Sequence, residues 1–257
     1  MRPYATAFGM SALRSIKNPG FIVIRALFFS VILIVFMALW KAAMQSANGS
    51  IAGYTFSDIL WYLMATETAV VSVPHRRIED IGDAISSGAY ETELLRPVSA
   101  AGIRIATELG QAVVTLAVLY TWGAALITTF VGPPNSLTCL LLGIPAVILA
   151  VSCDWIALHA FGAIAFWVGD TRASWFLLQK LVFVLGAMLL PLQFLPHAMQ
   201  VVAWALPFLA MAYIPGRIVS GHLEAWLLLV QLAWLVVLSI ATRQLFAIGE
   251  RRLRAGA

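Results

Sequence analysis

The sequence predicts an all-α membrane protein with six transmembrane helices, and we interpret residues 1–257 as a single transmembrane domain. Of these residues, 61% are hydrophobic and only 11% are charged, and the mean hydropathy is +0.92. Charged residues make up about a quarter of a soluble domain, so this composition is typical of a chain that crosses a bilayer several times. Apolar stretches of spanning length give the number of spans, and the distribution of basic residues gives their orientation.

Residues 1–20 predict a helix that lies in the membrane interface. Tyr4, Phe8 and Ala12 form an apolar stripe, and basic residues surround the polar side of the same helix. Residues 21–44 then form the first span, because this mostly apolar stretch is long enough to cross a bilayer. We expect no cleaved signal peptide, since no small-residue cleavage site follows this first apolar stretch.

Residues 54–73 form the second predicted span, and the helix predicted over residues 99–131 contains the third. Between them, residues 74–98 are polar and densely charged in a chain that is otherwise apolar. Water or another protein must solvate such a stretch, and a simple connection needs far fewer residues. We therefore interpret residues 74–98 as a cytoplasmic coupling loop, with a solvated loop as the alternative.

This coupling loop has a helical pattern. Ile78, Ile81 and Ile85 recur at helical spacing, while the acidic residues fall largely elsewhere on the helical wheel. Gly88 ends the predicted helix, and a second short piece with apolar and acidic residues follows. The pattern predicts an amphipathic helix beside the membrane, with an exposed apolar ridge that needs a partner.

Three more apolar stretches, residues 137–168, 175–195 and 225–242, complete the six spans. The first would measure about 48 Å as a helix, too long for one perpendicular crossing and too short for two, so we expect one tilted or bent span. Residues 196–221 are also apolar, but internal prolines would leave backbone carbonyls unsatisfied in lipid. We interpret them as an external re-entrant helical hairpin before the last span.

Basic residues set the orientation. With six spans and both termini in the cytoplasm, fourteen of the sixteen Lys and Arg residues lie inside and two lie outside, which is a strong positive-inside bias. A seventh span within residues 196–216 would export the arginine-rich tail, so we reject it. The outside residues are Lys41 and Arg217, and the inside ones are Arg2, Arg14, Lys17, Arg25, Arg76, Arg77, Arg96, Arg104, Arg172, Lys180, Arg243, Arg251, Arg252 and Arg254.

Catalytic and cofactor motifs are absent from the sequence. It contains no G-x-x-x-x-G-K-[ST] phosphate loop, so the chain is not expected to hydrolyse ATP by itself. It contains no H-E-x-x-H, no paired-cysteine metal spacing and no G-x-S-x-G, and its four histidines are scattered. We therefore expect no catalytic residues, no bound cofactor and no metal.

Three ionisable residues lie inside predicted spans: Glu67, Asp154 and His159. A charge at the bilayer centre costs at least about 2.5 kcal/mol, so such residues usually face a cavity or a partner. They could line a substrate path or relay protons, or they could form hydrogen-bonded contacts between helices. The sequence leaves both interpretations open.

The order of these parts resembles the ABC exporter permeases of the ABC-2 type. Three stretches carry the resemblance: IGDAISSGAYETELLRPVS (residues 81–99), FWVGDTRA (166–173) and PLQFLPHAMQVVAWALPFLAMAYIPGRIVSG (191–221). They are similar to a subgroup of permeases of about this length, some of them viologen-exporter-like. The likeness covers essentially the whole chain.

The resemblance implies a permease subunit of an ATP-driven exporter, in a bacterial inner (plasma) membrane with both termini cytoplasmic. It would form the substrate pathway as a dimer, with an identical chain or a sister permease. Two ATPase subunits on separate chains would bind ATP and Mg and dock on it, and no nucleic acid is expected. The implied ATPase-coupling interface comprises Ile78, Glu79, Ile81, Ile85, Glu91, Glu93, Leu94, Leu95 and Arg96.

Two functions of other classes are the alternatives. A proton-coupled secondary transporter could use Glu67, Asp154 or His159, but it normally shows an internal repeat, and the two halves of this sequence show no convincing one. An intramembrane enzyme acting on lipid headgroups would need several acids or histidines at one membrane face, whereas these are dispersed.

Overall fold

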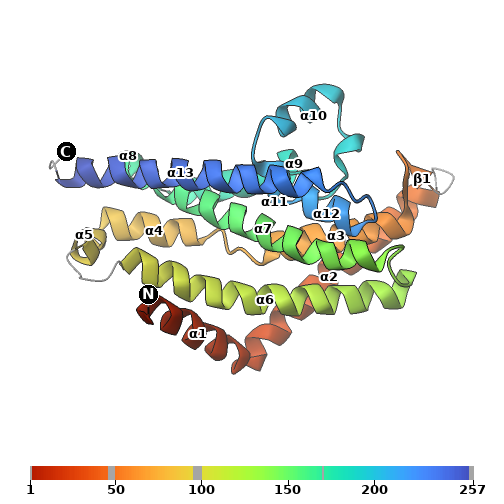
Figure 1. The fold of residues 1–257 in the computed structure, drawn as a ribbon, viewed down its shortest axis with the longest axis horizontal. Coiled ribbons are helices and arrows are strands. Elements are labelled where there is room, and N and C mark those ends of the chain that lie inside the picture. Colours follow the sequence, from red (N-terminus) through yellow and green to blue (C-terminus); the bar gives the residue numbers. More distant parts are fainter. Residues whose placement is uncertain (1, 46–49, 95–99, 170, 255–257) are drawn as a thin grey trace.

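The computed structural model describes residues 2–45, 50–94, 100–169 and 171–254. Its helices run mostly along one long axis (Figure 1). Four of them are long and apolar enough to cross a membrane within the described part of the chain. The prediction of a helical membrane protein is confirmed, with four of the described helices long and apolar enough to span. These four helices are α2 (Pro19–Gln45), α6 (Ala100–Val131), α7 (Leu137–Gly162) and α13 (Trp226–Arg254).

Helix α3 (Phe56–Val71) lies at the centre of the molecule, and every residue from Asp58 to Val70 is buried. A short hairpin of β1 (Ser50–Ile51) and β2 (Tyr54–Thr55) leads into it. The Thr55 hydroxyl accepts from the backbone N–H of Asp58, whose carboxylate accepts in turn from the Thr55 N–H, which is a capping box.

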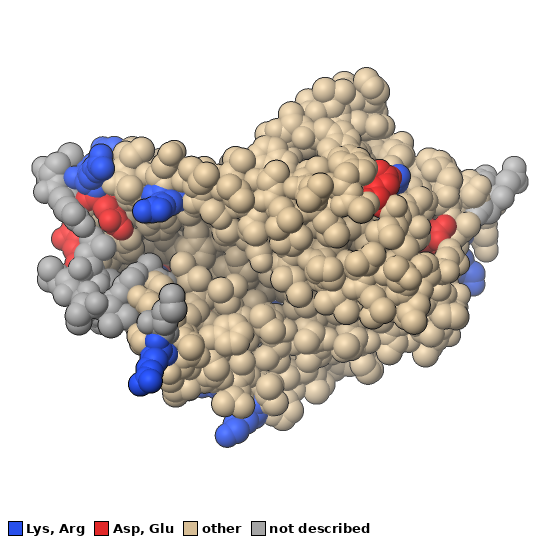
Figure 2. All heavy atoms as spheres, viewed as in Figure 1, with Lys and Arg blue, Asp and Glu red and all other residues tan. Residues whose placement is uncertain are grey.

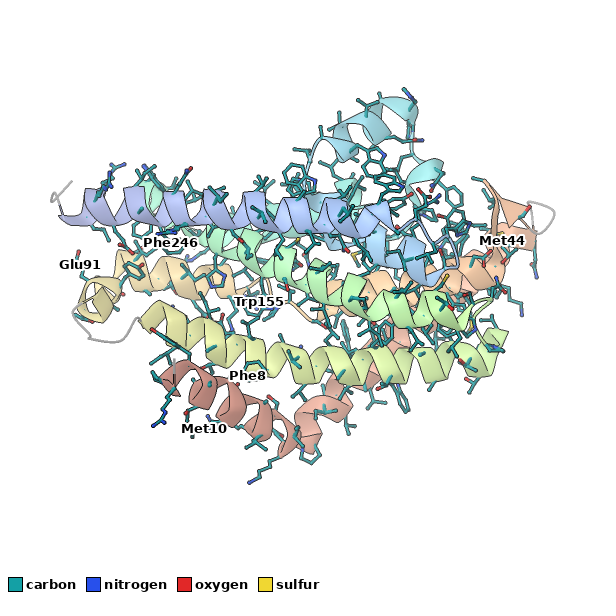
Figure 3. All side chains as sticks on the ribbon, viewed as in Figure 1. Phe8, Met10, Met44, Glu91, Trp155 and Phe246 are labelled. Atoms are coloured by element: carbon teal, nitrogen blue, oxygen red, sulfur yellow. The ribbon has the colours of Figure 1, made fainter. Side chains whose placement is uncertain are left out.

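Helix α1 (Arg2–Ile16) packs along α6 through glycines that allow a close approach. A Cβ on Gly110 would lie 2.3 Å from the backbone oxygen of Phe8, and one on Gly102 would lie 2.7 Å from the Tyr4 ring. Phe8 lies between α1 and α6, whereas Met10 lies on the other side of α1 and is 67% exposed (Figure 3). An exposed apolar face beside basic residues suits the predicted position in the membrane interface.

The predicted fourth span is one path with a break. Helix α7 ends at Gly162, and after a turn α8 (Ala165–Val168) continues to Gly169, whose φ of 76° ends the helical path. Helix α9 (Arg172–Leu185) follows and is shorter than the predicted fifth span. It ends before Ala187, whose φ of 51° is incompatible with a continued helix.

The region before α13 is broken into η1 (Leu192–Phe194), α10 (His197–Trp204), α11 (Phe208–Met211) and α12 (Tyr213–Val219). Helix α10 projects from the side of the helix stack (Figure 1). By contrast, α11 and α12 are almost entirely buried, and Gly216 of α12 lies so close to Tyr62 of α3 that a Cβ would not fit. Pro215 lies in the first turn of α12. Backbone N–H groups in a first turn make no hydrogen bond within the helix, so a proline there breaks none.

Candidate functional site

The segment after α3 folds into α4 (Arg77–Ser86) and α5 (Ala89–Leu94), which we call the α4–α5 segment. Gly88 joins them in the left-handed conformation with a φ of 74°, which suits glycine. The segment lies at the same end of the molecule as α8 and the end of α13, opposite β1 (Figure 1).

The isoleucines of α4 face inward, which corrects the predicted exposed ridge. Ile78, Ile81 and Ile85 are 0%, 6% and 6% exposed. Helix α4 packs against α7, α8 and α9, so other parts of the same chain cover its apolar face. Helical periodicity shows that one face is apolar, but it does not show what covers that face.

Close contacts fix α4 against the α8–α9 turn. A Cβ on Gly82 would lie 2.0 Å from the Thr171 hydroxyl oxygen, and that hydroxyl donates to the carbonyl of Ile78 at 3.2 Å. The Ser86 hydroxyl donates to the Gly169 carbonyl at 2.6 Å. Two of the three stretches that carry the family resemblance therefore meet here.

The α5 end is attached to α13. The Tyr90 hydroxyl donates to the Glu250 carboxylate at 2.9 Å. The Tyr90 ring lies 5.6 Å from the Phe166 ring and 6.3 Å from the Phe246 ring, measured between centroids, in an aromatic cluster that joins α5, α8 and α13. A displacement of α5 would therefore act directly on α8 and α13.

The outer face of the segment carries charge. Asp83 and Glu91 are exposed, and Glu91 lies at the tip of the molecule (Figure 3). Arg77 pairs with Asp80 at 3.0 Å on this face. Of the predicted interface, Leu95 and Arg96 lie outside the described residues, and Glu93 and Leu94 are placed only as part of the α5 backbone.

Two buried pairs lie between this segment and the spans. His75 Nε2 lies 2.9 and 3.0 Å from the two carboxylate oxygens of Asp154 on α7. Burial alone would lower the pKa of His75, but the negative charge and hydrogen bond of Asp154 outweigh it, so this pKa is raised overall. The loop before α4 is thereby tied to α7.

The second pair joins α6 and α7. His159 Nε2 lies 4.0 Å from a carboxylate oxygen of Glu108, while its Nδ1–H donates to the Trp155 carbonyl at 2.8 Å. Glu67 is 2% exposed on α3, and no described hydrogen bond or ion pair joins it to Asp154 or His159. Of the three ionisable residues predicted in the spans, two form contacts between elements of the fold and Glu67 lies apart from them.

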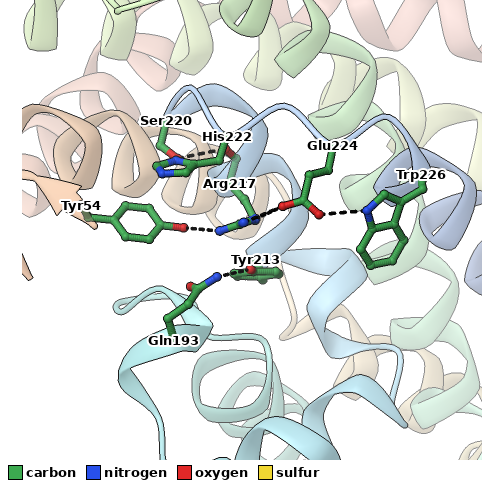
Figure 4. Close-up of polar contacts among 8 residues, drawn as sticks. All are labelled: Tyr54, Gln193, Tyr213, Arg217, Ser220, His222, Glu224 and Trp226. Carbon is green, nitrogen blue, oxygen red and sulfur yellow. Dashed lines mark hydrogen bonds and ion pairs between the residues drawn. The ribbon is translucent and has the colours of Figure 1, made fainter. Parts of the chain in front are cut away.

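A polar cluster closes the opposite end (Figure 4). Arg217 of α12 donates through Nη1 to the Tyr54 hydroxyl and through Nε to the Glu224 carboxylate, both at 2.9 Å. The indole N–H of Trp226 donates to the other oxygen of Glu224 at 2.8 Å. The hydrogen bond from Arg217 lowers the pKa of Glu224, so the cluster joins β2, α12 and the start of α13 through an ionised carboxylate.

A comparison with known families decides the identity. Residues 21–256 match the family described as ABC-2 family transporter protein. The chain belongs to the ABC-2 transporter family. The ABC-2 resemblance is thereby confirmed, and the chain is a multi-pass membrane permease of an ABC transporter. No curated protein and no solved structure matches it.

For this ABC-2 family permease, sequence reasoning missed several residues of the site. The sequence pattern predicts no role for His75, although this histidine directly follows a predicted span and lies beside the buried acid Asp154 in the structure. Tyr90 and Glu250 are far apart in the sequence, and their contact depends on α5 lying beside α13. Within the described residues, no group of three or more His, Cys, Asp or Glu side chains could hold a metal.

Proposed function

We propose that this chain is the membrane subunit of an ATP-driven exporter, which forms the substrate pathway as a dimer and is driven by separate ATPase subunits through the α4–α5 segment. The observation that carries the proposal is the two-faced packing of this segment. Its apolar face is held by α7, α8 and α9, and its charged face, with Asp83 and Glu91, is exposed. A partner that moves the charged face would move the spans with it.

In this arrangement the chain would have six spans, with both termini in the cytoplasm. Besides the four long helices, α3 and α9 would cross the membrane. Helices of 16 and 14 residues measure about 24 and 21 Å, short of the roughly 30 Å hydrocarbon core, so each would complete its crossing only with the residues that flank it. The α11–α12 pair, buried against α3, would then be the returning arm of the re-entrant hairpin.

The two kinds of residue in the coupling interface would have different roles. Glu79, Glu91 and Glu93, with Leu94, Leu95 and Arg96, would contact the ATPase subunit. Ile78, Ile81 and Ile85 would anchor α4 to the spans. The His75–Asp154 pair and the Tyr90–Glu250 hydrogen bond would carry the motion to α7 and α13. ATP-driven closure of the ATPase pair could then open the interface between the spans outward.

Charge reversal on the exposed face tests this role. We expect the D83K/E91K variant to insert normally, but to retain at least about fivefold less ATPase subunit than the parent when purified from its native membrane, because each lost interface contact costs about 1 kcal/mol or more. ATP hydrolysis by the purified preparation should fall in parallel.

The matched control is Lys41→Glu, an exposed charge reversal at the far end of α2, which should leave ATPase capture unchanged. If D83K/E91K captured the ATPase subunit as well as the parent does, the α4–α5 segment would be a solvated connection only. ATP hydrolysis by the isolated chain would contradict the separate-subunit arrangement.

A further inference from the structure

A groove lies between α6, α7 and α13, with a cavity volume of about 780 Å³. Its walls are mostly apolar and include Leu109 of α6, Ile156 of α7, and Leu235 and Phe246 of α13. Figure 2 shows the face of the molecule hollowed between α13 and α6, and Figure 3 shows Trp155 and Phe246 between the helices on that face. The volume is that of a site for a small ligand.

The spacing of residues along α13 indicates where the groove lies relative to the membrane surfaces. Trp226 is exposed at the start of this helix and suits the aromatic belt at one membrane surface. Arg243 follows it by 17 residues, about 26 Å along the axis, which places Arg243 near the opposite surface of a hydrocarbon core of about 30 Å. Leu235 lies two turns deeper, so the groove runs from the headgroup level toward the middle of one leaflet.

Charge distinguishes the shallow end of the groove. Arg243 lines the groove and is exposed, and no described acidic residue lies within ion-pair distance of it. The other charged wall residue on α13, Glu250, accepts a hydrogen bond from Tyr90 and lies two turns nearer the end of the chain. An apolar groove with an unpaired guanidinium at headgroup level is complementary to a phosphate carrying acyl chains.

We propose that this groove binds an anionic phospholipid, with its phosphate on Arg243 and an acyl chain along the wall formed by Leu109, Ile156 and Leu235. Under the cytoplasmic orientation of the proposed function, the lipid comes from the cytoplasmic leaflet. Binding itself does not depend on the ATPase partner. Because Phe246 and Tyr90 line the same groove beyond Arg243, the headgroup of a lipid here would lie toward the junction of α5 with α13.

The test is lipid retention. The full chain is reconstituted in vesicles of phosphatidylcholine and phosphatidylglycerol, extracted in mild detergent and weighed by native mass spectrometry. The parent should retain phosphatidylglycerol in preference to phosphatidylcholine, and Arg243→Gln should lower the retained phosphatidylglycerol about fivefold, the effect of one basic residue at an anionic lipid. Ala247→Trp, which fills the groove, should lower retention of both lipids.

Arg251→Gln is the matched control, since Arg251 is exposed on the same helix but does not line the groove. It should retain phosphatidylglycerol like the parent. Equal retention by the parent, Arg243→Gln and Ala247→Trp overturns the proposal. A second result would also overturn it. If Ser239→Cys formed a disulfide between two copies in lipid-free preparations, a second chain and not a lipid would cover the groove. Neither result depends on ATPase capture, so this proposal and the coupling role fail separately.

Discussion

Among the individual side-chain contacts, the strength of the His75–Asp154 pair should depend on pH, because His75 can gain or lose a proton. Both side chains are almost fully buried, at 4% and 2% exposure, so the pair is shielded from solvent. A buried charge without its partner is strongly destabilising. The pair therefore holds the start of the α4–α5 segment on α7 most strongly while the histidine is protonated, because the hydrogen bond then also joins two opposite charges.

The raised pKa of His75 predicts a pH dependence of this attachment. Since the pKa in the folded protein lies above the ordinary value of about 6.5, the stabilisation is complete below that value and is lost as pH rises through the folded pKa. We expect thermal unfolding in detergent, and proteolysis within the α4–α5 segment, to become easier as pH rises above neutral.

The Asp154→Asn variant supplies the comparison. It should be less stable than the parent at pH 6, by about 3 kcal/mol or more, and its stability should vary less with pH. If the parent and the variant showed the same pH profile, the pair would not be the titrating contact.

At the scale of elements, α4 is held by contacts that leave no room for a side chain. The Cβ position at Gly82 nearly overlaps the Thr171 hydroxyl, and a Cβ at Gly162 would lie 2.9 Å from Ile81. These close approaches explain why two separate glycines lie where α4 meets α7 and the α8–α9 turn. Helix α4 is thus closely packed against α7 and the α8–α9 turn.

Gly82→Ala should therefore push α4 away from the α8–α9 turn. Overpacking of this kind costs about 1 to 3 kcal/mol, and we expect a lower thermal midpoint together with weaker coupling of ATP hydrolysis to export. Adding Thr171→Ala removes the clashing oxygen and should restore part of the loss. Gly9→Ala, in a helix where an added Cβ meets nothing within 4 Å, is the control, and an equal loss there would refute the packing explanation.

The same elements show how far the sequence could be interpreted. Apolar length was enough to predict α2, α6 and α13, because each needs only a bilayer around it. The isoleucines of α4 were placed on one face correctly, but their burial depends on α7, α8 and α9. The partners of Asp154 and His159 could not be derived either, since they depend on how loops and helices distant in sequence pack together.

At the scale of the whole molecule, the two ends differ in how they are closed. On the face shown in Figure 2, charged side chains lie mostly toward the ends, with a largely uncharged band between them. The end with β1 is closed by the Arg217 cluster, which joins three elements. The other end carries the α4–α5 segment and the end of α13. The segment contacts α7, α8, α9 and α13, so a displacement of it would move several helices together.

The two ends should lie on opposite sides of the membrane. Because fourteen of the sixteen basic residues belong to one side in the six-span arrangement, the end with the α4–α5 segment should face the cytoplasm. Single cysteines at Ser87 and Leu223, both exposed positions, report the two ends once Cys139 and Cys153 are replaced by alanine. An impermeant thiol reagent on intact cells should label Leu223→Cys and reach Ser87→Cys only after the membrane is opened. The reverse labelling pattern would show that the molecule has the opposite orientation. A cytoplasmic ATPase could then not contact the α4–α5 segment.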